Sequence, residues 1–225
     1  MKQKERVGIN LLKRLKNDYI FRTFIFSALS FFITLAFTIY NTFLGFAYKA
    51  VWNTGIAIYY ALLLFIRAYV MFSERKFFKE KLNAEQLENK RKKLFLVQSI
   101  MLFIIDFALI APVSIMVLQK KAVEYSSIPA IAAAAYTTYK IIVSTKNIVK
   151  TRRMNHISVK ILRTVGFVDA LVSVLTLQYT LIMTFGGGMD KDMFVLCAVT
   201  SFGIWMALVI LSVNLLLQAI RPKKQ

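Results

Sequence analysis

The stretch 161–185, ILRTVGFVDALVSVLTLQYTLIMTF, decides the class of fold. It holds 25 residues and is strongly apolar, and a helix needs about 20 such residues to cross the hydrocarbon core of a bilayer. One carboxylate, that of Asp169, lies inside it. Because a carboxylate at membrane depth is costly unless it is paired or neutral inside a helix bundle, Asp169 predicts that other helices surround this one.

The rest of the chain has the same apolar character. Of its 225 residues 58% are hydrophobic and only 18% are charged, whereas soluble domains are about half apolar and about a quarter charged. Six segments are long enough, or nearly so, to cross a bilayer. We therefore predict an all-α fold, a polytopic transmembrane helix bundle that forms a single domain over 1–225. The predicted spans are 20–47, 51–72, 94–118, 128–144, 161–185 and 193–219.

The basic residues predict the orientation of these spans. The two terminal tails and the segments 73–93 and 145–160 hold 24 of the 30 Lys and Arg residues, counting Arg22 and Arg163 at span entrances. The three other loops hold only 4. The positive-inside rule then places both termini and both basic loops in the cytoplasm, in a multi-pass protein of the cell membrane.

The same charge distribution bears on the partners of the protein. The net charge of +19 is concentrated on one side of the membrane, so the expected partners are the bilayer and its anionic inner-leaflet lipids. The sequence contains no aromatic–basic motif of the kind that would predict nucleic-acid binding. The segment 73–93 contains neither Pro nor Gly and is expected to extend the second and third spans as a cytoplasmic helical hairpin.

Weak internal similarities suggest a repeat. The stretch 27–42 is similar to 169–184 at a spacing of 142 residues, and Arg67 aligns with Lys140 at a spacing of 73. Asp106 similarly aligns with Asp169. These matches indicate three tandem, parallel helical hairpins, with chance similarity between apolar helices as the alternative.

Four ionisable residues fall within the spans: Asp106, Asp169, Arg67 and Lys140. Arg67 and Lys140 lie close enough to their span ends for their long stems to reach the interface. Aspartate has no such stem, so both carboxylates are expected to point into the bundle. Depth along the spans matches Asp169 with Lys140 or Arg67 as its counter-ion. A purely structural pair and an ion-binding site remain alternatives.

Hydroxyl groups accompany Asp169 at helical spacing. Ser173, Thr176 and Thr180 follow it at intervals of 4, 3 and 4, and the first span carries a similar face that includes Thr34, Thr38 and Asn41. Two interpretations stay open: hydrogen bonding that packs the helices together, and a polar groove for a solute or ion. The predicted binding residues are Asp169, Asp106, Ser173, Thr176, Thr180, Thr34, Thr38 and Asn41, with Lys140 and Arg67 as counter-ions.

The sequence offers little support for other chemistry. One His and one Cys, His156 and Cys197, give neither a metal site nor a disulfide framework. No paired catalytic motif appears at membrane depth, so we predict no enzymatic activity and no cofactor. Pro112 is expected to bend the third span and free a backbone carbonyl near Asp106.

The run 16–72, which begins KNDYIFRTFIF and ends FIRAYVMF, resembles the start of uncharacterised six-helix membrane proteins of bacteria. The resemblance implies a bacterial membrane protein and no particular activity. Two functions therefore remain: a small solute or cation transporter that uses the polar groove, and a non-transporting scaffold, assembly or sensor protein. In the second, the basic cytoplasmic face binds lipid or a partner. The sequence leaves open a homo-oligomer or an unknown membrane partner.

Overall fold

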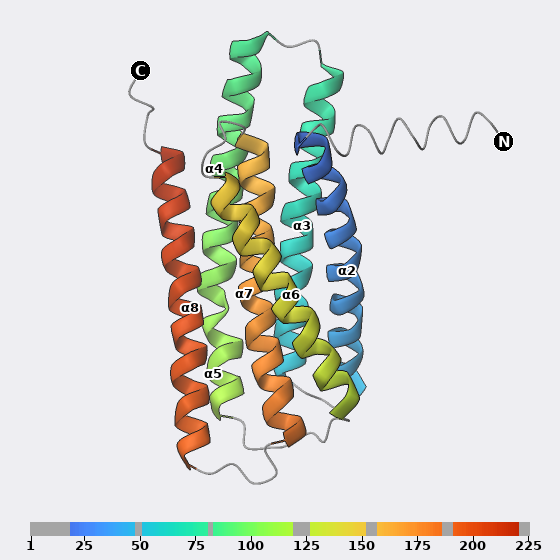
Figure 1. The fold of residues 1–225 in the computed structure, drawn as a ribbon. Helices are drawn as coiled ribbons and strands as arrows, with labels where there is room; N and C mark the ends of the chain where they lie inside the picture. Colours follow the sequence, from blue (N-terminus) through green and yellow to red (C-terminus); the bar gives the residue numbers. More distant parts are fainter. Residues whose placement is uncertain are drawn as a thin grey trace, which may run out of the picture.

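The fold is a bundle of helices that run up and down along a common direction (Figure 1). The computed structural model describes residues 19–47, 51–80, 83–118, 127–151, 157–185 and 191–220. All regular secondary structure within these ranges is α-helical, as predicted. The helices are α2 (Tyr19–Ala47), α3 (Val51–Lys79), α4 (Ala84–Ala108), α5 (Ile110–Leu118), α6 (Ser127–Thr151), α7 (Ile157–Phe185) and α8 (Lys191–Ile220).

Five stretches of helix in the described residues are long and apolar enough to cross a membrane. They are Ile25–Ala47, Val51–Lys79, Ala84–Ile115, Ile157–Ile182 and Val195–Ile220. The span predicted at 128–144 corresponds to α6, which is a helix but is not among the five. Its lysines, Lys140, Lys146 and Lys150, lower its hydropathy. The structure therefore supports five of the six predicted spans.

The outer surface of the bundle is apolar in a way that suits lipid. On α2 the side chains of Phe32, Phe43 and Phe46 are 65%, 66% and 81% exposed, and α8 presents Val199 and Met206 in the same way. Apolar faces of this extent on long helices are typical of surfaces that contact hydrocarbon chains. Helix length and composition thus make the chain a multi-pass membrane protein in contact with the bilayer.

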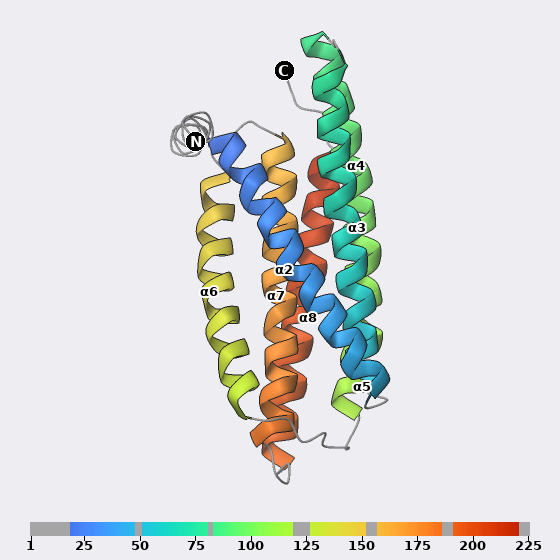
Figure 2. The ribbon, with the colours of Figure 1, turned by 90° about the vertical axis from the view of Figure 1, so that its right-hand side faces the viewer.

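The pairing of helices differs from the predicted tandem hairpins. α2 packs along α3 as expected, but α4 packs chiefly along α8, and α6 along α7 (Figure 2). Only the first of the three predicted hairpins is therefore a closely packed pair. Each of these pairs is joined by a polar contact: Ser212 of α8 donates to Asp106 of α4, and Lys140 of α6 donates to Asp169 of α7.

The helical extension predicted for 73–93 is present. α3 runs to Lys79 and α4 begins at Ala84, so the two helices project together beyond the bundle (Figure 1). Glu74 of α3 links the two helices where the projection begins. Arg91 of α4 donates to its two carboxylate oxygens, from Nε at 3.1 Å and from Nη2 at 3.0 Å. Ser158 at the start of α7 also donates to Glu74. The segment 145–160, predicted as a loop, is instead largely helical at the ends of α6 and α7.

The third predicted span contains a short break at Leu109, while Ala84–Ile115 still forms one candidate span, and the bend expected at Pro112 stays a prediction. α4 ends at Ala108 and α5 begins at Ile110, and the carbonyl oxygen of Asp106 accepts a hydrogen bond from Trp205 Nε1 at 3.1 Å. Close to this break α3 approaches Pro112 at Gly55. A Cβ atom at position 55 would lie 2.8 Å from Pro112 Cβ, so only glycine allows this approach without a shift.

Candidate functional site

Asp169 lies fully buried on α7 and joins four helices. Its Oδ2 atom accepts Arg67 Nη2 of α3 at 2.8 Å and Thr34 Oγ1 of α2 at 3.2 Å. Its Oδ1 atom accepts Lys140 Nζ of α6 at 2.8 Å. Arg67 and Lys140, the two counter-ions predicted from their depth along the spans, therefore both bind Asp169. They do not reach out to the interface, since their side chains are only 3% and 11% exposed.

Further hydroxyl groups extend this cluster on one side. Lys140 Nζ also donates to Ser173 Oγ at 2.7 Å, and Ser173 Oγ donates to the Asp169 carbonyl oxygen at 2.7 Å. The Tyr60 hydroxyl of α3 lies 3.4 Å from both Ser173 Oγ and Thr176 Oγ1. Tyr60 was not among the predicted binding residues. Its contacts join α3 to the hydroxyl face of α7.

The remaining predicted polar residues make contacts within their own helix or between α2 and α3. Thr38 donates to the Thr34 carbonyl oxygen and Thr180 to the Thr176 carbonyl oxygen, both at 2.8 Å. Asn41 accepts a hydrogen bond from Asn53 Nδ2 at 3.2 Å, which links α2 to α3. The hydroxyl faces of α2 and α7 meet at Thr34 and Asp169. Thr38 and Thr180 satisfy the backbone of their own helices.

Asp106 belongs to a different site. Tyr59 donates to its Oδ1 atom at 2.5 Å and Ser212 donates to its Oδ2 atom. No ion pair reaches Asp106 from any side chain in the described ranges. The two intramembrane carboxylates therefore have different environments: Asp169 has two bases, and Asp106 has hydroxyl donors only.

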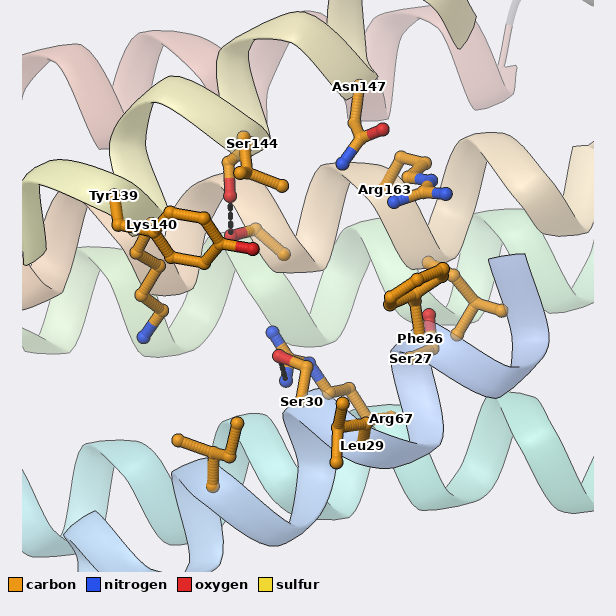
Figure 3. Close-up of a pocket in the computed structure, with 14 residues that line it drawn as sticks. Phe26, Ser27, Leu29, Ser30, Arg67, Tyr139, Lys140, Ser144, Asn147 and Arg163 are labelled. Atoms are coloured by element: carbon orange, nitrogen blue, oxygen red, sulfur yellow. Dashed lines mark hydrogen bonds between the residues drawn. The ribbon is translucent and has the colours of Figure 1, made fainter. Parts of the chain in front are cut away.

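A cavity of about 450 Å³ opens beside the Asp169 cluster (Figure 3). α2 and α6 form its walls, and α7 and α3 supply residues between them. It is lined by Phe26, Ser27, Leu29, Ser30, Ile33, Arg67, Tyr139, Lys140, Val143, Ser144, Asn147, Leu162, Arg163 and Gly166. Three of these residues are bases, and none of the described lining residues is an Asp or Glu.

The charges give this cavity a net positive character. Asp169 supplies one negative charge against the two positive charges of Arg67 and Lys140, so the cluster keeps an excess of one. Arg163 adds a further positive charge to the lining. An excess of positive charge among the described residues of the cavity attracts anions and repels cations.

Small and polar side chains leave room beside these bases. A Cβ atom at Gly166 would lie 3.9 Å from Arg67 Nη2, so the missing side chain keeps space open next to the guanidinium. Arg67 Nη1 donates to Ser30 Oγ at 3.0 Å, and Ser144 Oγ donates to the Gly166 carbonyl oxygen at 3.3 Å. Arg163 Nη2 donates to Thr23 Oγ1 at 3.0 Å. These contacts hold the bases at the cavity wall.

Several cavity residues were absent from the sequence prediction, although a signal for them was present. Lys140, Ser144 and Asn147 are spaced by 4 and 3, which places them on one helical face. The prediction ended the fourth span at 144 and treated Arg163 as an orienting charge at a span entrance. Continuing the helix to Thr151 brings Asn147 into line with Lys140.

The described helices and the site define a class, an all-helical multi-pass membrane protein with five candidate spans. No known family model, curated protein or solved structure matches the chain. The resemblance of 16–72 to bacterial six-helix proteins therefore stays a prediction. The function rests on the geometry of the site alone.

Proposed function

We propose that this membrane protein is a transporter of an anionic solute and that the cavity between α2 and α6 is its binding site. The observation that supports this proposal is the lining of the cavity, which holds three bases, Arg67, Lys140 and Arg163, and no Asp or Glu among its described residues. The cation transport considered from the sequence has less support, because Asp169 already binds two bases. The proposed activity involves no covalent chemistry.

The geometry suggests how a bound anion affects the bundle. Lys140 joins α6 to α7 through Asp169 and Ser173. An anion in the cavity competes with Asp169 for the ammonium group, since both are acceptors of charge-assisted hydrogen bonds. Binding then weakens a link between the two helices. A transporter needs such a change in helix contacts to open the site to one side and then the other.

The orientation of the protein forms part of this proposal. The 24-to-4 distribution of basic residues places both termini and the α3–α4 projection in the cytoplasm. In a Cys197→Ser background, single cysteines at Asn83 and Ser126 test it. An impermeant thiol reagent added to intact cells should label position 126 and not position 83. Labelling of position 83 alone would reverse the orientation.

Flux into proteoliposomes tests the transport proposal. Purified protein should carry at least one member of a panel of inorganic and organic anions faster than empty liposomes. Arg163→Gln should reduce that flux about tenfold, the effect of losing one charged hydrogen bond. Lys160→Gln is the matched control, because it also removes one positive charge from α7. Lys160 donates to Gln218 of α8, away from the cavity. Flux of alkali cations without any anion flux would overturn the proposal.

A second function, a non-transporting scaffold, assembly or sensor protein, is favoured by one specific observation. Asp169 accepts three side-chain hydrogen bonds, so the cluster by itself satisfies its polar groups and joins helices. In that case the basic end of the bundle binds lipid or a partner, including a second copy of the chain. Folded protein that carries no tested solute would favour this function.

A further inference from the structure

We propose that the anion bound in the cavity is the phosphate group of a membrane lipid, which enters sideways from the bilayer between α2 and α6. Its hydrocarbon chains then remain outside, against the apolar faces of these two helices. This inference rests on the anion site proposed above and adds the class of ligand and its route of entry. The rim of the cavity, its depth and its size support this ligand.

The rim of the cavity is apolar and outward-facing. Phe26 and Leu29 of α2 are 52% and 55% exposed, and Tyr139 of α6 is 65% exposed. α2 and α6 each pack against α7, which leaves the cavity walled by two helices that have no extensive contact with each other (Figure 2). A rim of this kind suits the passage of a lipid, since the exposed surface of a membrane-spanning helix contacts hydrocarbon chains.

The depth of Arg163 matches the position of lipid phosphates. α7 has 29 residues and is therefore about 43 Å long, while the hydrocarbon core of a bilayer is about 30 Å thick. If α7 is centred, the core begins about 7 Å from the end at Ile157. Arg163 then lies about 9 Å from that end, at the headgroup boundary, and Asp169 about 18 Å from it.

This order of residues gives a path for the phosphate. Arg163 meets the group at the boundary, and Lys140 and Arg67, which contact the deeper Asp169, lie further in. Figure 3 shows these three bases around the cavity. Phosphate oxygens accept hydrogen bonds well from guanidinium and ammonium groups, and Arg can bind two of them at once. Ser144 and Asn147 offer further polar atoms on the α6 wall.

The size of the cavity agrees with a headgroup and not with a whole lipid. A volume of about 450 Å³ is near the lower part of the range for small-molecule sites, about 300–1,000 Å³. The hydrocarbon chains of a phospholipid therefore have to stay outside. Leu29 and Ile33 on α2 and Val143 on α6 give them apolar contacts next to the cavity.

Native mass spectrometry of the purified full chain in detergent provides the test, with three probes. Dioctanoyl phosphatidic acid carries both the phosphate and the chains, dioctanoylglycerol lacks the phosphate, and inorganic phosphate lacks the chains. We expect one phosphatidic acid per chain, retained at least tenfold more tightly than either of the other probes.

Two variants locate the bound lipid, each with a matched control. Gly166→Leu fills the cavity from α7, and Gly203→Leu places the same side chain on α8, where a Cβ atom meets nothing within 4 Å. Arg163→Gln removes a lining base, and Lys160→Gln removes a base outside the cavity. Gly166→Leu and Arg163→Gln should each lower lipid retention about tenfold, while both controls retain it.

The possible outcomes separate this inference from the proposed function. If inorganic phosphate binds as tightly as phosphatidic acid, the ligand is a soluble anion, and only the lipid inference fails. If no phosphate-bearing probe binds, or if dioctanoylglycerol binds equally well, both the inference and the anion site fail. Equal losses in a variant and its control would also remove the cavity as the binding site.

Discussion

The isosteric change Asp169→Asn tests the central cluster most directly. It keeps the shape of the side chain and removes its charge, so Arg67 and Lys140 lose their shared counter-ion. Breaking a buried ion pair by removing one partner costs about 3–5 kcal/mol in soluble proteins. A protein of this size shifts its melting temperature by about 2–4 °C per kcal/mol. We therefore expect a drop of about 6–20 °C.

Asp106→Asn is the matched control, because it makes the same chemical change in the other intramembrane carboxylate. Asp106 accepts hydrogen bonds from Tyr59 and Ser212, and the described residues give it no ion pair. An amide can keep contacts with both hydroxyl groups, which act as donors or acceptors. The expected cost is that of one altered hydrogen bond, about 1 kcal/mol.

The measurement is thermal unfolding of both variants in the same detergent, followed by the fluorescence of the two tryptophans. A third variant tests the electrostatic cause: Asp169→Leu combined with Arg67→Met and Lys140→Met removes all three charges. Replacing a whole buried ion cluster by apolar residues is often neutral or stabilising, so this variant should recover most of the loss. Equal shifts for Asp169→Asn and Asp106→Asn, together with no recovery, would refute the reasoning.

Two further predictions concern the periphery of the bundle. Gly55→Ala places a Cβ atom 2.8 Å from Pro112 Cβ and should destabilise the protein by about 1–3 kcal/mol in thermal unfolding, while Gly203→Ala, with open space, should be neutral or slightly stabilising. A destabilised Gly203→Ala with an unaffected Gly55→Ala would contradict the α3–α5 approach. The hydrogen bond from Lys90 holds the pKa of Glu80 below its ordinary value of 4.5. Their contact therefore stabilises the α3–α4 projection at neutral pH, and this stabilisation is lost as the pH falls below that value. The melting-temperature difference between Glu80→Gln and the unchanged protein should therefore shrink on acidification, and a difference that persists at low pH would exclude this cause.

The sequence by itself determined the helices and their class. Hydropathy is a local property, so the span predicted to begin at residue 20 starts within one residue of α2, which begins at Tyr19. The cost of a buried charge in a bilayer also acts on single residues, which is why Asp169 could be assigned to the bundle interior and matched in depth with Arg67 and Lys140. The predicted span 128–144 is the shortest of the six, and the structure does not support it as a membrane span.

Only the tertiary structure decided which helices are neighbours. Helical spacing assigns Ser30 to one face of α2 and Lys140 to one face of α6, but it carries no information about which of these faces meet in the folded protein. The pairing of α4 with α8 and of α6 with α7 follows from contacts between residues about 30 to 106 positions apart, as at Asp169 and Asp106. The cavity has the same origin, because Arg67 and Arg163 reach it from helices that are distant in the chain. Its positive charge is a sum over three helices, and no single segment of the sequence contains that sum.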